Sequence, residues 1–260
     1  MTLLNIGSCG LHVVHNSFKS GVVASEWDIA SLLKSLYYLF NDAPTRKADF
    51  LKLGSKPRLK FCGHRWLENV NVAERAIEIW PTVVKYADEV RKGNLSNPSC
   101  ASFKIISEFE KDPLVLAKLH SFLFIAKILK PFLTKFQGSE PLAPFLCGDL
   151  FNIVKRLYAL ILKAPFLSEV KDFSDLIPPK DIDKSNFKLH SNIDCGYQAM
   201  ELLEKQKKVS GLKKMEFKMS FQKLVKSCVN KILEKSPLHY QFAHSITCLN
   251  PKAIQQWYLN

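Results

Sequence analysis

Apolar residues recur at steps of three and four along most of the chain, which is the spacing of one face of an α-helix. The clearest case follows a short apolar run, Leu59–Cys62, that Gly63 closes. The apolar face of the helix predicted after this run holds seven residues: Trp66, Val70, Ala73, Ile77, Trp80, Val84 and Ala87. We predict a brief strand or an extended entry over the run. We predict a helix after it that kinks at Pro81 and continues to about Lys92.

The same period predicts further helices on both sides of this segment. The first should be capped by Ser8, and the next two should cover about residues 25–40 and 45–53. After the central helix, five more are expected, over about residues 99–110, 113–136, 142–162, 195–208 and 213–234. One to three short strands are expected, near Met1–Ile6 and Leu59–Cys62. The predicted fold class is therefore mainly α.

Proline and charge patterns divide the chain into four parts. Residues 166–191 contain Pro178, Pro179 and several aspartates, a composition typical of a linker. We place the first helices in residues 1–66 and a helical region in 67–165. A basic helical part covers residues 192–260.

The positive charge of the chain bears most directly on its possible partners. The chain of 260 residues has 37 Lys and Arg against 24 Asp and Glu, a formal net charge of +13. Such a surplus favours polyanionic partners, nucleic acid first and an acidic membrane surface second. Five lysines could contact phosphates or form a nuclear-import signal: Lys205, Lys207, Lys208, Lys213 and Lys214. The alternative for these lysines is a solvated helix end. No apolar run approaches the roughly 20 residues of a membrane span, so we expect no membrane insertion.

The seven cysteines are dispersed and form no disulfide framework. No signal-peptide pattern opens the chain, so we expect an intracellular setting, the nucleus before the cytoplasm. Cys9 with His12, and Cys62 with His64, could supply four zinc ligands. However, 49 residues lie between the two pairs, which fits no standard zinc finger. A buried cysteine beside a hydrogen-bonded histidine is the preferred interpretation, and we expect no metal and no cofactor.

Arg65 and Trp66 stand at the joint between the apolar run and the central helix. A guanidinium and an indole at one helix entry could hold a phosphate and stack a base. A core position for Trp66 is the simpler interpretation. A nucleophilic pair of Cys62 and His64 is disfavoured, because we expect their side chains to lie on opposite sides of the segment and because no oxyanion-stabilising framework is recognisable in the sequence. The sequence has no phosphate-binding glycine loop and no hydrolase or metalloprotease motif.

Two short motifs resemble elements of the hAT superfamily of transposases. Cys9-x-x-His12-x-Val14-His15-Asn16 is similar to the Cys-x-x-His-x-Leu-Asn-Leu element at the start of a helix in these proteins. Phe61-Cys62-Gly63-His64-Arg65-Trp66 resembles their Arg-Trp element at the end of a core strand. The late Cys248-Leu249-Asn250-Pro251 is similar to a Leu-Asp-Pro segment of the family.

The resemblance implies a ribonuclease H-like core that is split by a helical insertion. Residues 1–66 would supply core elements, and residues 67–165 the insertion. hAT transposases use three acidic residues that hold divalent metal, two before the Cys-x-x-His helix and one beyond the insertion. The resemblance places these acids outside the chain, so we expect no enzymatic activity. The expected function is that of a non-catalytic, transposon-derived fragment with non-specific nucleic-acid binding, and DNA is the expected partner. The alternative is a helical scaffold for protein partners.

Overall fold

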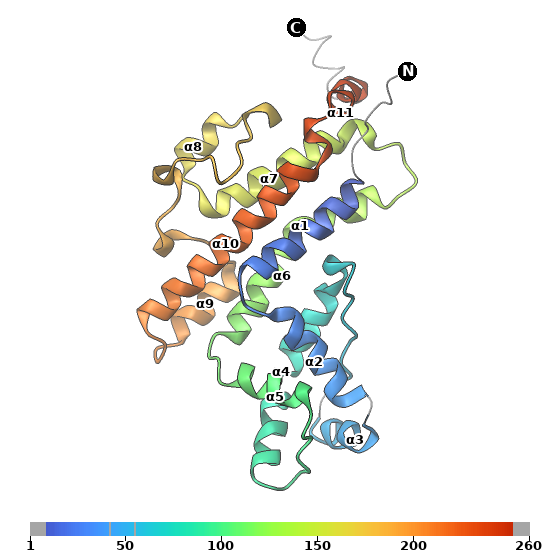
Figure 1. Cartoon of the computed structure of the whole chain (residues 1–260), viewed down its shortest axis with the longest axis vertical. Coiled ribbons are helices and arrows are strands. Elements are labelled where there is room, and N and C mark those ends of the chain that lie inside the picture. The colour runs from blue at the N-terminus through green and yellow to red at the C-terminus, as the bar shows by residue number, and fades with distance from the viewer. Residues whose placement is uncertain (1–8, 42, 55, 252–260) are drawn as a thin grey trace. The chain divides into compact units, whose positions relative to one another are not determined.

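A computed structural model describes residues 9–41, 43–54 and 56–251 of the chain (Figure 1). Helices dominate these residues, and they contain no strand; an isolated antiparallel bridge joins Leu162 to Phe187. The predicted mainly α fold class is confirmed. No helix of the described part is both long and apolar enough to cross a membrane. The expected strand at Met1–Ile6 and the Ser8 cap lie outside the described residues.

The strand alternative for Leu59–Cys62 is wrong: the segment is extended but pairs with no other strand among the described residues. The side chain of Asn69 occupies the backbone groups that a ladder would use. Its Oδ1 accepts the N–H of Cys62 at 2.7 Å, and its Nδ2 donates to the Cys62 carbonyl at 2.9 Å. A side chain seven residues ahead thus replaces the neighbouring strand.

The chain forms two compact units, and each is discontinuous in sequence. The first contains residues 1–25, 125–195 and 215–260, and the second contains residues 26–124 and 196–214. The four parts predicted from the sequence follow one another along the chain, whereas both units combine distant segments.

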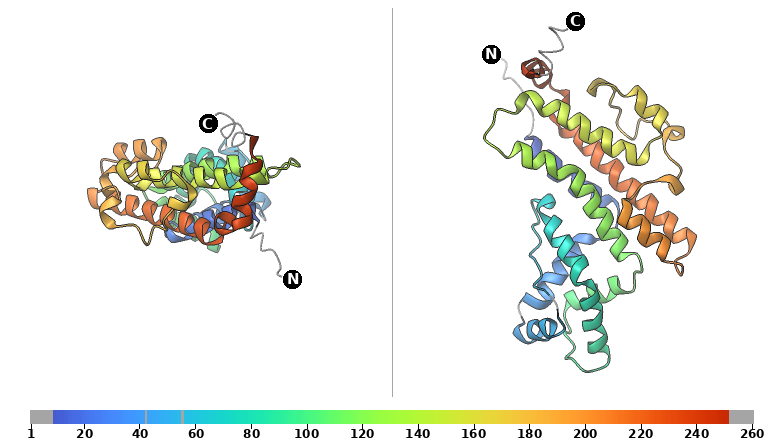
Figure 2. Two further views of the ribbon diagram at one scale, coloured as in Figure 1. Left: turned by 90° about the horizontal axis from the view of Figure 1, so that it is seen from above. Right: turned by 180° about the vertical axis from the view of Figure 1, so that it is seen from behind.

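The first unit is built around two helices that are far apart in sequence. In Figures 1 and 2, α1 (Gly10–Ala24) lies beside α10 (Gly211–Lys235), whose residues from Met215 onwards belong to this unit. The hydroxyls of Ser20 and Ser227 are 3.0 Å apart across this contact. The unit also contains the following elements: the second half of α6 (Val115–Phe136), η2 (Ala143–Phe145), α7 (Leu146–Ile161), α8 (Ala164–Glu169), η3 (Phe173–Asp175), η4 (Lys184–Asn186), η5 (His190–Asn192), η6 (Pro237–His239), α11 (Gln241–Ser245) and η7 (Ile246–Leu249).

Gly21 permits the close approach of α1 to α10. A Cβ atom at Gly21 would lie 2.7 Å from the carbonyl oxygen of Leu224 and 3.1 Å from the Cβ of Cys228. We therefore expect Gly21→Ala to lower the free energy of unfolding by about 1–3 kcal/mol, through overpacking. Gly148 in α7 is the control, since a Cβ there meets nothing within 4 Å. Gly148→Ala should raise stability by up to ~1 kcal/mol, the gain in helix propensity. Urea denaturation of both variants decides, and a stabilising Gly21→Ala would contradict the close approach.

Residues 166–191, the predicted linker, belong to the first unit and are fastened by lysines. The ammonium of Lys155 donates to the carbonyl of Val170 at 2.6 Å, and that of Lys188 donates to Ala159 at 2.6 Å. Val170 and Ile182 are buried. This segment therefore packs on the unit through both apolar contacts and hydrogen bonds.

The second unit has an aromatic core. Phe40, Phe50 and Tyr86 are buried, and the rings of Phe40 and Phe50 stack with centroids 4.0 Å apart. The elements of this unit are α2 (Ile29–Asn41), α3 (Pro44–Lys52), η1 (Trp66–Asn69), α4 (Val70–Arg91), α5 (Ala101–Glu110), the first half of α6, α9 (Tyr197–Lys205) and the start of α10.

The predicted helices are present, with shifted ends. α4 runs through Pro81 as predicted, and the proline ring is exposed. α2 begins at Ile29 instead of near Ser25, because Glu26 and Asp28 have positive φ angles of 59° and 49° and form a turn first.

Candidate nucleic-acid interface

The five candidate lysines lie on one continuous segment of the second unit, from α9 through a turn at residues 206–210 to the start of α10. Lys205 differs from the others because its ammonium forms an ion pair with Glu201, one helical turn earlier. The hydrogen bond to Glu201 raises the pKa of Lys205, with smaller contributions from the charge of Glu201 and from Tyr197. Of the five ammonium groups, that of Lys205 is thus already paired with a carboxylate.

The other four lysines form the candidate surface, here called the four-lysine surface: Lys207, Lys208, Lys213 and Lys214. Lys214 is half-buried and the other three are exposed. Within the described part of the chain, none of their side chains forms an ion pair or a hydrogen bond. The surface therefore offers four ammonium groups that are not engaged by a carboxylate of the described chain.

The start of α10 adds to the positive character of this surface. The first turn has no acidic residue, although an acidic residue there would stabilise the positive end of the helix dipole. Lys213 and Lys214 occupy it instead, and Ser210 accepts the backbone N–H of Lys213 at 3.3 Å. Placing cations at this end costs free energy, which a bound anion would offset.

Two further lysines of α10, Lys218 and Lys226, are occupied within the first unit. Lys218 donates to the carbonyl of Ser191 at 2.5 Å. The ammonium of Lys226 lies 3.8 Å from the centre of the Phe187 ring. Burial lowers the pKa of Lys226, and the charge of Lys184 lowers it further. These contacts fold the loop onto the helix, so the number of lysines in the sequence overstates the free positive charge on α10.

At the joint, the core interpretation of Trp66 is confirmed. Trp66 is only 6% exposed, and its Nε1–H donates to the carbonyl of Gly63 at 2.9 Å. The ring of Phe61 meets it edge-on, with centroids 5.3 Å apart. Arg65 is exposed and could contact a phosphate. A base could stack on Trp66 only if the joint opened, so the paired role predicted for Arg65 and Trp66 does not fit this geometry.

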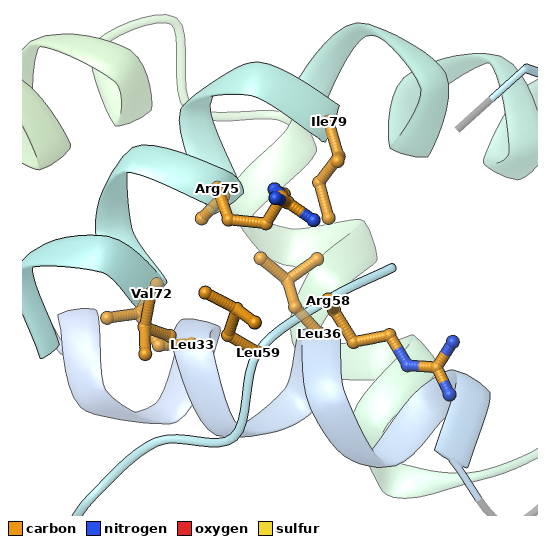
Figure 3. Close-up of a pocket in the computed structure, with 8 residues that line it drawn as sticks. Leu33, Leu36, Arg58, Leu59, Val72, Arg75 and Ile79 are labelled. Atoms are coloured by element: carbon orange, nitrogen blue, oxygen red, sulfur yellow. The ribbon is translucent and has the colours of Figure 1, made fainter. Parts of the chain in front are cut away.

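Near this joint, the extended segment crosses α2 and α4. Figure 3 shows Leu59 beside apolar side chains that include those of Leu33, Leu36 and Val72. The guanidinium of Arg58 donates to the carbonyl of Phe40 at 2.7 Å, and that of Arg75 donates to the carbonyl of Pro57. The cavity left underneath has a volume of about 10 Å³, room for one water molecule at most. The two arginines thus fasten the segment and line no ligand site.

The candidate zinc ligands do not converge. Within residues 9–251, apart from 42 and 55, no group of three or more His, Cys, Asp or Glu side chains could hold a metal ion. Cys9 is exposed, so its predicted burial beside a histidine is wrong, and His12 is exposed too. The Sγ of Cys62 lies 3.8 Å from the Nε2 of His64, so the expectation that these side chains lie on opposite sides is also wrong; residues two apart on an extended segment share a side. The chain turns at Gly63 and His64, which brings them together.

Two features of the interface were missed from the sequence. The Glu201–Lys205 pair could have been found, since opposite charges four residues apart on a helix are neighbours. Tyr197, 76% exposed on the first turn of α9, could not, because an aromatic residue shortly before Ala199 and Met200 fits a buried face equally well.

We compared the chain with protein-family models, with curated proteins and with solved structures, and nothing matched. The function is therefore inferred from the residues of the chain itself.

Proposed function

We propose that the chain is a non-catalytic, helical, nucleic-acid-binding protein derived from a hAT-like transposase. The observation that carries the binding proposal is the four-lysine surface, where Lys207, Lys208, Lys213 and Lys214 lie within eight consecutive residues and engage no carboxylate of the described chain. A regular polyanion suits this surface, since each neutralised phosphate releases counterions into solution.

The transposase origin rests on the Cys9/His12 and Arg65/Trp66 motifs and on the helical character of the chain. In this proposal, the helices after Trp66 correspond to the insertion of a ribonuclease H-like transposase. Binding would be independent of base sequence, because ammonium groups that contact phosphates carry no information about the bases.

The test replaces the four lysines of the surface with glutamine and measures affinity for a 20-base-pair duplex by fluorescence anisotropy at several salt concentrations. For the unaltered chain, log affinity should fall with log salt by about 0.9 per neutralised phosphate. The variant should bind at least about tenfold more weakly at low salt, with a slope flatter by about 3–4. Its stability should change little, since side chains that are exposed or half-buried at the surface and have no partner contribute little to folding.

A charge-matched variant separates local binding from general attraction. It replaces four exposed lysines dispersed over other elements: Lys19, Lys60, Lys85 and Lys104. Both variants have a net charge lower by the same amount, so equal losses of affinity would argue against a defined surface. Glu201→Gln releases Lys205 and should strengthen binding. If the unaltered chain binds neither a duplex nor a single strand at low salt, the nucleic-acid proposal is wrong and the protein-scaffold alternative replaces it.

A further inference from the structure

Tyr197 is the aromatic residue that the second unit presents most openly. It is 76% exposed, whereas Trp66, the stacking candidate from the sequence, is 6% exposed. Tyr197 stands on the first turn of α9, in the same segment of the unit as the four-lysine surface. Any aromatic contact with a nucleic acid at this segment therefore falls to Tyr197.

The backbone before Tyr197 is held firmly. Gly196 is buried and has a φ angle of 93°, a backbone conformation that residues with a side chain rarely adopt. A Cβ atom there would lie 2.7 Å from the Cγ of Phe124, so the backbone packs directly on the Phe124 ring. This contact anchors the start of α9 inside the unit. Tyr197 thus projects from a fixed backbone, which lowers the entropy lost when its ring is ordered by a ligand.

Tyr197 lies on the face of α9 that also holds Lys205, the last residue before the turn with Lys207 and Lys208. Tyr197, Glu201 and Lys205 are spaced four residues apart and share one face. The distance from Tyr197 to Lys205 along the axis is about 12 Å, at ~1.5 Å per residue. A stacked strand advances roughly 3.4 Å per nucleotide, so this distance corresponds to about three or four nucleotides. The intervening Glu201 is paired with Lys205, which reduces its repulsion of phosphates.

We propose that Tyr197 stacks on an unpaired base of a single-stranded nucleic acid whose phosphates contact the four-lysine surface. This inference rests on the proposed function and specifies its substrate. Each base has a flat aromatic face, so stacking tolerates any sequence. In a duplex these faces are covered by neighbouring base pairs, and exposing them requires unstacking. Single strands should therefore bind more tightly than duplex of equal length.

The experiment compares the full chain with Tyr197→Ala, Tyr197→Phe and Tyr38→Ala. Tyr38 is the control because it is 51% exposed on α2, a helix without any of the five candidate lysines. The probes are a labelled 20-nucleotide thymidine strand and a 20-base-pair duplex. Tyr197→Ala should weaken single-strand binding by about fivefold or more, change duplex binding less than twofold and leave the salt slope unchanged. Tyr197→Phe should retain the single-strand affinity, and Tyr38→Ala should change nothing.

Any other result contradicts either the stacking inference or the proposed function. If the chain binds both probes with a lysine-dependent salt slope, and Tyr197→Ala changes neither affinity or both equally, the stacking inference fails while the proposed function stands. If the chain binds neither probe at low salt, the proposed function fails and the inference with it. Unchanged helical circular dichroism and melting temperature in Tyr197→Ala would show that a loss of binding is not a loss of fold.

Discussion

Trp66→Ala should lower the free energy of unfolding by about 3–5 kcal/mol. The indole is buried, packs edge-on against Phe61 and donates its N–H to the carbonyl of Gly63. Alanine removes the apolar area, leaves a cavity between the extended segment and η1, and deprives the Gly63 carbonyl of its donor. Urea denaturation followed by far-ultraviolet circular dichroism measures the change without depending on the fluorescence of the altered tryptophan.

Two further variants test whether this loss of stability comes from the buried indole. Arg65→Ala removes an exposed neighbour and should change stability by no more than about 0.5 kcal/mol. Trp66→Phe keeps most of the ring but loses the hydrogen bond, so its loss of stability should lie between those of Trp66→Ala and Arg65→Ala. A Trp66→Ala variant that folds with full stability but binds single strands more weakly would instead favour an accessible stacking role for Trp66.

The helices could be predicted from the sequence because their pattern is local. Residues three and four apart share a face whatever the rest of the chain does, and Pro81, exposed on its helix, interrupts neither the pattern nor the helix. The four-part division rests instead on composition. Composition cannot show that α1 packs on α10, about 200 residues away, because that contact depends on one glycine opposite a backbone carbonyl.

The candidate interface could be predicted only in part, for a similar reason. The lysines are obvious in the sequence, but the sequence does not show which of them contact other groups of the chain. Lys218 and Lys226 are occupied by a carbonyl and by an aromatic ring of a loop that precedes them by more than 20 residues. Lys207 and Lys208 lie in a turn with no such partner in the described chain. Which charges remain free for a ligand thus depends on tertiary contacts.

The joint at Leu59–Cys62 illustrates the same limit. An apolar run closed by glycine is typical of a buried strand, and the periodicity after it is typical of a helix. Nothing in either pattern marks Asn69, a polar residue inside the predicted helix, as the group that satisfies the backbone of the run. Asn69 is 0% exposed, and its amide also donates to the carbonyl of Trp66 at 3.0 Å. The extended segment therefore needs no partner strand.

Asn69→Ala should consequently destabilise the chain by about 2–4 kcal/mol, because it leaves the N–H of Cys62 and the carbonyls of Cys62 and Trp66 without their partner. Asn69→Asp preserves the shape and the bond to the Cys62 N–H, but its carboxylate faces both carbonyls. Burial and these carbonyls raise the pKa of the new carboxyl, so its destabilisation should shrink as the pH falls and the group is protonated.

Asn71, exposed on α4, gives the matched control: Asn71→Ala should change stability by no more than about 0.5 kcal/mol. Urea denaturation at neutral and acidic pH compares the three variants. Asn69 variants as stable as the Asn71 control would show that solvent satisfies Cys62 without the side chain. In that case the extended segment would be held mainly by Leu59, by Trp66 and by the hydrogen bonds of Arg58 and Arg75.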